Sequence, residues 1–242
     1  MSEMLLAVNA LSKGFGGFAA LSDVSLAVPQ GERLGIIGPN GSGKTTLINC
    51  ICGSLRNDAG SIRFCDAEVT RLPAYQRTRL GIARSFQLPR PFSSMTLIEN
   101  IAVPLEYVTH RKLIDRVDVH REAMAILERM GLGAKAQFAS NALTQVDLRK
   151  LELARAMAAR PRLLILDEVM AGLSSVEVDE MLDIVLELNR EGVTVIMIEH
   201  IMRAIMRFSQ RVICFDAGRV LAEASPERIV TDVNVQRVYL GA

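Results

Sequence analysis

The sequence predicts an α/β fold with a largely parallel core sheet, an antiparallel β subdomain and a helical insertion. Three observations support this prediction. Short apolar runs alternate with longer helical patterns, which is typical of a parallel sheet with helical crossovers. Two segments alternate more loosely and carry glycines, which is typical of hairpins. A long central segment places apolar residues at helical spacing.

Size and composition are those of a compact, folded protein. The chain has 242 residues, half of them apolar, which is enough for a substantial buried core. Its net charge is +1, from 28 basic and 27 acidic side chains without charged blocks. The charge of the chain therefore does not indicate a surface that binds nucleic acid or anionic lipid, and we expect no nucleic-acid partner.

The mean hydropathy of +0.24 is high. No apolar run reaches the roughly 18 residues that a membrane span requires, so the apolar excess suits a core or a protein interface. The first residues lack the pattern of a secretory signal, and a cytoplasmic location is expected. Four cysteines in a chain of this size do not form a disulfide framework, and we expect buried free thiols.

Four apolar runs, partly β-branched, are expected to form the centre of the core sheet, buried on both faces. They cover residues 32–38, 162–167, 193–200 and 211–216. The hairpin pattern of residues 5–28 and the segment 60–69 are expected to form a separate antiparallel sheet.

Residues 88–160 are expected to form a helical insertion between two core strands, with Pro161 ending its last helix. The final segment, from residue 224, has room for one short helix.

The segment GPNGSGKTT follows a predicted strand and precedes a helical pattern, which is the context of a phosphate-binding loop. Its glycines let backbone N–H groups point at phosphates. Lys44 is expected to reach the β and γ phosphates, Thr45 to offer its hydroxyl to Mg²⁺ and Thr46 to lie near the α phosphate. The predicted nucleotide-binding residues are Gly38, Pro39, Asn40, Gly41, Ser42, Gly43, Lys44, Thr45 and Thr46.

Two carboxylates end the predicted strand RLLILDE. Asp167 is suited to hold the metal ion, and Glu168 to orient and polarise the attacking water. His200 follows the next core strand, at the sheet edge where ligands of open α/β folds bind, and can donate a hydrogen bond to a γ phosphate. His110 and His120 lack such a setting and are expected on the surface. The absence of an N-K-x-D motif counts against a GTPase.

With these residues in place, the sequence resembles the ATP-binding subunits of ABC transporters over nearly its whole length, and most of all those of the branched-chain amino acid importer group. The resemblance rests on six segments in the family's order. They are KGFGGFAALSDVSLAV, GPNGSGKTTLINCICG, ARSFQLPRPFSSMTLIENI, LLILDEVMAGLS, VIMIEH and GRVLAEASPERIV.

The resemblance implies a single ABC ATPase domain over residues 1–242, with a RecA-like P-loop NTPase core. Residues 1–87 and 161–242 would form this core and the antiparallel β subdomain, and 88–160 the insertion. Phe15 matches the aromatic residue that stacks on adenine. Gln87 matches the glutamine that reaches Mg²⁺ and the attacking water. The loop 171–174 matches one that crosses the dimer interface.

The family's signature loop, commonly LSGGQ, begins a helix that faces the ATP of a partner subunit in a head-to-tail pair. Here it is LTQVD, and Thr144 keeps the hydroxyl. Val146 replaces glycine with a branched side chain, and Asp147 adds a charge that repels a γ phosphate unless it is aimed away. Two interpretations stay open. Either this chain pairs with a different ATPase and one ATP site is degenerate, or a shifted helix start accommodates the valine and both sites work.

The resemblance implies an ATP- and Mg²⁺-dependent ATPase on the inner face of the cell membrane. It would energise import of branched-chain or other apolar amino acids, with a second ATP-binding subunit, expected to be a different one. Two membrane permease subunits and an external substrate-binding protein complete the complex. Two alternatives remain: a low-turnover ATP-binding assembly or regulatory subunit, and the ATPase of a urea or short-amide importer. A chromosome or repair ATPase would need a long coiled coil that this chain lacks.

Overall fold

The computed structural model describes residues 3–85, 90–109 and 116–240. Within these ranges the core sheet has six strands, in the order β10 (Arg219–Ala224), β9 (Arg211–Asp216), β3 (Arg33–Ile37), β8 (Thr194–Ile198), β7 (Leu163–Asp167) and β6 (Ile82–Arg84). The pairs from β9 to β6 are parallel, and β10 returns antiparallel to β9. The four predicted central strands are confirmed, and each begins and ends within two residues of its predicted bounds.

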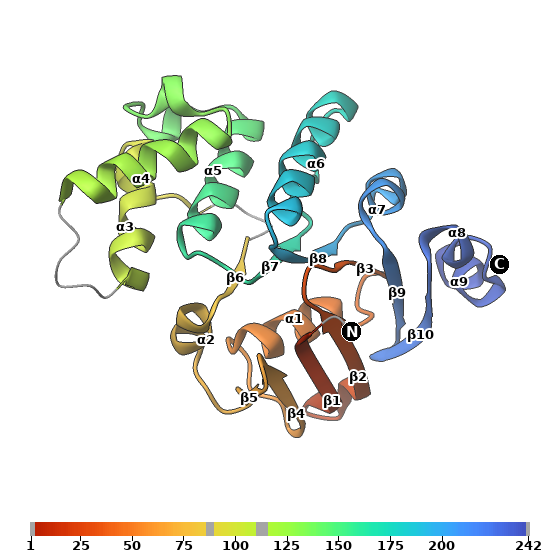
Figure 1. The fold of residues 1–242 in the computed structure, drawn as a ribbon. Coiled ribbons are helices and arrows are strands. Elements are labelled where there is room, and N and C mark those ends of the chain that lie inside the picture. The colour runs from red at the N-terminus through yellow and green to blue at the C-terminus, as the bar shows by residue number, and fades with distance from the viewer. Residues whose placement is uncertain (1–2, 86–89, 110–115, 241–242) are drawn as a thin grey trace.

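The predicted antiparallel sheet is also present (Figure 1). It has the order β2 (Phe18–Pro29), β1 (Met4–Phe15), β4 (Ala59–Phe64) and β5 (Ala67–Glu68). The β1–β2 hairpin turns at Gly16 and Gly17, and its last pair is Phe15 with Phe18. This hairpin therefore carries two aromatic residues at its tip.

Helices pack against the core sheet, and a group of helices lies at one end of the molecule (Figure 1). Helices α1 (Lys44–Cys52) and α2 (Ala74–Leu80) precede β6. Between β6 and β7 lie α3 (Leu97–Thr109), α4 (Arg116–Arg129), the 3-10 turns η1 (Gly133–Lys135) and η2 (Ser140–Ala142), and α5 (Gln145–Ala158). Helices α3, α4 and α5 gather at one end of the molecule, far from α8 (Pro226–Ile229) and α9 (Val233–Leu240) (Figure 1). Helices α6 (Ser175–Arg190) and α7 (Met202–Phe208) flank the sheet between these groups.

Two details differ from the sequence prediction. The last segment forms two short helices rather than one, because Asp232 accepts hydrogen bonds from the backbone N–H groups of Asn234 and Val235 and starts a second helix. Two of the four free cysteines, Cys52 and Cys65, are only half-buried. Among the described residues, no helix combines the length and apolar character needed to cross a bilayer.

Alternate residues of the central strands enter two different hydrophobic cores. In β7, Leu164 and Leu166 pack with the insertion helices, whereas Leu163 and Ile165 pack with α1 and the antiparallel sheet. Every residue of β7 and β8 is buried. Both faces of the sheet are thus covered, which explains why these strands read as continuous apolar runs.

Arg77 in α2 joins α1 to the polypeptide that follows it. Its guanidinium is buried and donates to four carbonyls, at 2.7 to 2.9 Å, of Cys50, Ile51, Thr70 and Leu72. Two of these carbonyls, of Cys50 and Ile51, belong to the last turn of α1, where carbonyls run out of regular helical partners, although the Gly53 N–H also donates to Cys50 at 3.2 Å. The arginine therefore fixes the end of the helix that begins at the phosphate loop.

We expect Arg77→Met to lower the free energy of unfolding by about 3 kcal/mol, because several buried carbonyls lose a charged donor. Urea unfolding followed by circular dichroism measures this change. Arg190→Met is the matched control, since Arg190 is exposed and pairs with the exposed Glu187, and should cost less than about 1 kcal/mol. Equal effects of the two substitutions would contradict the role given to Arg77.

Candidate active site

The predicted phosphate loop connects β3 to α1 and is pressed against neighbouring strands. Gly38 and Gly43 have positive φ angles of 147° and 103°. A Cβ atom on Gly38 would lie 2.3 Å from the Phe215 carbonyl oxygen, and one on Gly43 would lie 2.6 Å from that of Ala20. Only glycine fits these two positions, because both the dihedral angles and the space exclude a side chain.

Lys44, the first residue of α1, folds its side chain back over the loop. Its Nζ donates to the carbonyl oxygens of Gly38 at 2.7 Å and Pro39 at 2.8 Å, and it lies 3.4 Å from Ser42 Oγ. Burial lowers the pKa of Lys44, and the nearby carboxylates of Glu168 and Asp167 oppose this shift. An anion that binds in the loop would find the ammonium group already in place.

A cavity of about 240 Å³ lies between this loop, the tip of the β1–β2 hairpin and the end of β7. Phe15 and Phe18 line it from the hairpin, and their side chains are largely exposed. Lys13 Nζ lies 5.6 Å from the centroid of the Phe15 ring. The other lining residues are Ala20, Asn40, Gly41, Ser42, Gly43, Lys44, Thr45, Thr46 and Glu168.

The structure thus brings together, around one cavity, most residues that the sequence analysis assigned to nucleotide binding, together with Glu168. Phe18 and Ala20 were missed. The pattern F-G-G-F places Phe18 opposite Phe15 across a two-glycine turn, and this hairpin register was the signal available in the sequence.

Asp167 ends β7 beside an arginine that the sequence analysis also missed. Its Oδ2 accepts a hydrogen bond of 2.5 Å from Arg84 Nη2, and both side chains are largely buried. Arg84 is the last residue of β6, the neighbouring strand, and its Nη1 donates to Asn49 of α1 at 2.6 Å. Asp167 does not line the cavity itself, and its assignment as a metal ligand stays a prediction.

Glu168 and His200 lie together at the carboxyl edge of the sheet. Glu168 Oε1 and His200 Nε2 are 2.8 Å apart. Glu168 has a φ angle of 50°, a strained value for a residue with a side chain, and its backbone N–H donates to Ile198 at 2.9 Å. Such outliers are concentrated at functional sites, where the fold holds a side chain in a required direction.

The remaining predicted residues fall as follows. Gln87 and His110 lie outside the described residues. His120 is exposed, as expected. In the loop 171–174, Ser174 caps α6 in a capping box with Glu177.

The altered signature segment begins α5. Thr144 caps the helix, accepting from the Asp147 backbone N–H, and Val146 is half-buried. The Asp147 carboxylate is aimed at Lys135 Nζ, 2.5 Å away. Burial alone would raise the pKa of Asp147, but hydrogen bonds from Lys135 and Thr144 hold it below its usual value.

This donor set fits a nucleotide phosphate chain and its magnesium ion. The tight glycine loop presents backbone N–H groups, Lys44 supplies a cation and Thr45 a hydroxyl at the same cavity. Glu168 adds a carboxylate to this cavity, and Asp167 precedes it in the chain, so oxygen ligands of the kind that a hard cation needs lie close by. The geometry supports hydrolysis of a phosphoanhydride.

The comparisons with known proteins agree with this chemistry. The family model described as "ABC transporter" matches residues 21–171. The chain is 38% identical to the high-affinity branched-chain amino acid transport ATP-binding protein LivG of Escherichia coli, over 100% of this chain and 99% of that protein.

Two solved structures are similar over most of their length. The ADP conformation of an ATP-binding cassette of an ABC transporter superposes with a TM-score of 0.90, 30% identity and 99% coverage of each chain. A dimeric bacterial ABC transporter cassette has a TM-score of 0.84, 25% identity and coverage of 92% of this chain and 99% of that one. The chain therefore belongs to the ABC transporter family, as an ATP-hydrolysing subunit of a transporter complex.

Proposed function

We propose that this subunit hydrolyses ATP to energise an importer of branched-chain or other apolar amino acids, on the inner face of the cell membrane. The observation that supports hydrolysis is the meeting of Lys44, Glu168 and His200 at one sheet edge beside the glycine loop. The full-length similarity to LivG supports the substrate class. Two permease subunits and an external binding protein would complete the complex.

Each residue has a role that follows from its position. Lys44 would exchange its loop carbonyls for the β and γ phosphates. Glu168 would orient the attacking water and accept its proton, and His200, within 2.8 Å, would hold Glu168 and donate to the γ phosphate. Bound Mg²⁺ would neutralise charge on the phosphate oxygens, with Thr45, Asp167 and Gln87 as its predicted ligands.

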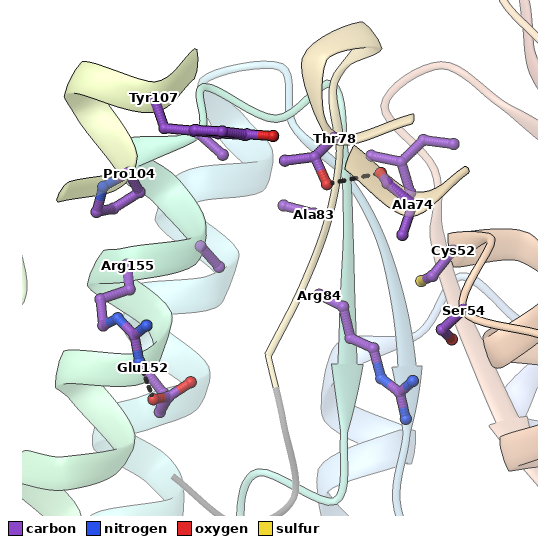
Figure 2. A pocket seen from close by; sticks show the side chains of 13 residues that line it. Cys52, Ser54, Ala74, Thr78, Ala83, Arg84, Pro104, Tyr107, Glu152 and Arg155 are labelled. Atoms are coloured by element: carbon purple, nitrogen blue, oxygen red, sulfur yellow. Dashed lines mark hydrogen bonds and ion pairs between the residues drawn. The ribbon is translucent and has the colours of Figure 1, made fainter. Parts of the chain in front are cut away.

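A groove beside β6 is suited to a permease segment. It has a volume of about 260 Å³ and lies between the core and the insertion. Tyr107 and Pro104 of α3 and Arg155 of α5 lie on one side, and Arg84 and Cys52 lie on the other (Figure 2). Arg84 also contacts Asp167. A segment that docks in this groove would therefore touch a side chain that is itself bonded to the predicted metal ligand.

As an ABC ATPase the chain works in a pair, and we propose that its partner is a different ATPase with an intact signature. This chain keeps the phosphate loop, both carboxylates and His200. The ATP site on this chain would then be completed by the signature segment of the partner. The altered LTQVD segment would face the partner's ATP. Because Asp147 is turned toward Lys135, the remaining obstacle there is the Val146 side chain.

Reconstituted with its permeases and second ATPase in vesicles, the complex should hydrolyse ATP faster when the external binding protein carries leucine than when it is empty. Phosphate release measures this rate. Stimulation by urea or a short amide instead would overturn the amino acid assignment, and a rate that no ligand changes would favour the low-turnover regulatory alternative.

The control for chemistry at this chain is Glu168→Gln, which keeps the shape of the site. It should bind ATP normally and lower turnover at this site by about 10² to 10³-fold, because the water loses its base. Rapid hydrolysis at this site by the variant would contradict the role of Glu168 as the base that accepts the proton of the water.

Val146→Gly should raise turnover of the mixed pair by about tenfold, because it restores close backbone approach to the partner's phosphates. The gain should persist when Glu168→Gln is added to the same chain, since the site that improves belongs to the partner. An unchanged ATPase and transport rate would show that the valine is tolerated and that both sites already work.

Asp147→Asn should lower the free energy of unfolding by about 1 kcal/mol near pH 7, a small value because Lys135 is 40% exposed. The folded state lowers the pKa of Asp147, so its contribution is complete above the unfolded pKa of about 4 and is lost as the pH falls through the folded pKa. Urea unfolding of both proteins between pH 7 and pH 3 measures the difference. The exposed pair of Asp118 and Arg121 gives the control, Asp118→Asn. A difference that persists in acid would mean that shape, not charge, is responsible.

A further inference from the structure

Glu199 is a buried carboxyl group that the hydrolytic mechanism does not use. It follows β8 and directly precedes His200, and only 2% of it is exposed. It does not line the cavity beside the phosphate loop. Burial raises the pKa of Glu199 to about 7, and its position next to two catalytic side chains therefore needs a reason.

The Glu199 carboxylate binds the backbone of the segment that carries Glu168. Its Oε1 accepts a hydrogen bond of 2.9 Å from the N–H of Met170, two residues after Glu168. Glu199 is itself joined to His200 by a peptide bond. One carboxylate thus connects the segment that carries Glu168 with the segment that carries His200, and these two side chains are 2.8 Å apart.

A third segment, α5, contacts the loop after Glu168 through Arg149. Arg149 is buried, and its charge opposes the rise in the pKa of Glu199, although the nearby Glu168 carboxylate favours that rise more strongly. Arg149 Nη2 donates to the Ala171 carbonyl at 3.4 Å, and Gln145 Nε2 reaches the same oxygen at 3.5 Å. Gln145 belongs to the altered signature segment, so the start of α5 is bound to the loop that follows Glu168.

We propose that Glu199 is a positioning residue for ATP hydrolysis, which holds the segments that carry Glu168 and His200 in one fixed arrangement. The inference rests on the proposed function, because it assigns Glu199 a task in the same site. It follows from geometry: a buried carboxyl group that directly precedes His200 accepts the Met170 N–H from the loop that carries Glu168, and Glu168 and His200 are in contact.

The test compares Glu199→Met, which removes the acceptor, with Glu199→Gln, which keeps an oxygen for the Met170 N–H. In the complete transporter, Glu199→Met should lower kcat by about 10 to 100-fold, because a small displacement of the catalytic groups is costly. The KM for ATP should change less than about twofold, since the phosphate loop is untouched. Glu199→Gln should restore kcat to within about threefold of the original protein, because the acceptor is what matters.

Asn189→Leu provides the matched control. Asn189 is also a buried polar residue that binds two backbone carbonyls, of Gly31 and Val193, but it lies near the start of β8, at the opposite end of the strand. It should lower thermal stability as Glu199→Met does and leave kcat per folded complex unchanged. If both variants lose kcat equally, the effect is general destabilisation and the proposal is wrong.

Two further outcomes decide the question. An unchanged kcat in Glu199→Met, or a raised KM with unchanged kcat, would overturn the positioning role. Should Glu199→Met fail to fold, Glu199→Asp replaces it, because the shorter side chain keeps the charge but withdraws the acceptor from Met170. It must then have a lower kcat than Glu199→Gln. Absence of ATPase activity in the unmodified complex would count against the proposed function instead.

Discussion

The pairing of β7 with β8 is the constraint on which the site depends. The two strands run parallel in a register that sets Asp167 beside Ile198, so the residues that follow each strand leave the sheet at the same edge. Glu168 and His200 are 32 positions apart in the sequence but meet there. The pairing of β3 with β8 brings the phosphate loop to that edge as well. A slip of one residue between β7 and β8 would exchange the buried faces of a strand that is apolar on both, and would separate Glu168 from His200.

Charges near this edge are balanced by residues from other elements. Arg84 of β6 pairs with Asp167, and Lys135 of η1 pairs with Asp147. Both carboxylates are buried, so an unbalanced charge would be costly, and the arrangement in which both are paired is favoured over near alternatives. Buried ion pairs add little net stability, and their value here lies in fixing the positions of the segments that carry them.

Much of this arrangement could be predicted from the sequence, because the strongest signals are local. The glycine loop, the carboxylates after an apolar strand and the histidine after the next strand each carry their own context. The missed residues depend on distant partners. Arg84 lies in a strand of three residues, too short to show a period, and its partner is 83 positions away. Glu199 reads as the end of an apolar strand, and only the fold brings Met170 to it.

The altered signature segment raises two separate questions, one about the charge of Asp147 and one about the side chain of Val146. The charge of Asp147 raised the objection of repulsion, but the carboxylate is bound to Lys135, and the backbone N–H of Asp147 donates to the capping Thr144 hydroxyl. Thr144 still caps the helix, so its amide groups keep their direction. The valine is different, because a branched Cβ cannot be turned away from the backbone to which it is attached. The first turn of α5 therefore keeps the capped geometry of a helix N-terminus, but the Val146 side chain changes its surface. In the proposed pair, this surface would be turned toward the partner's ATP, and a change confined to it is what a pair of unequal ATPase subunits would require.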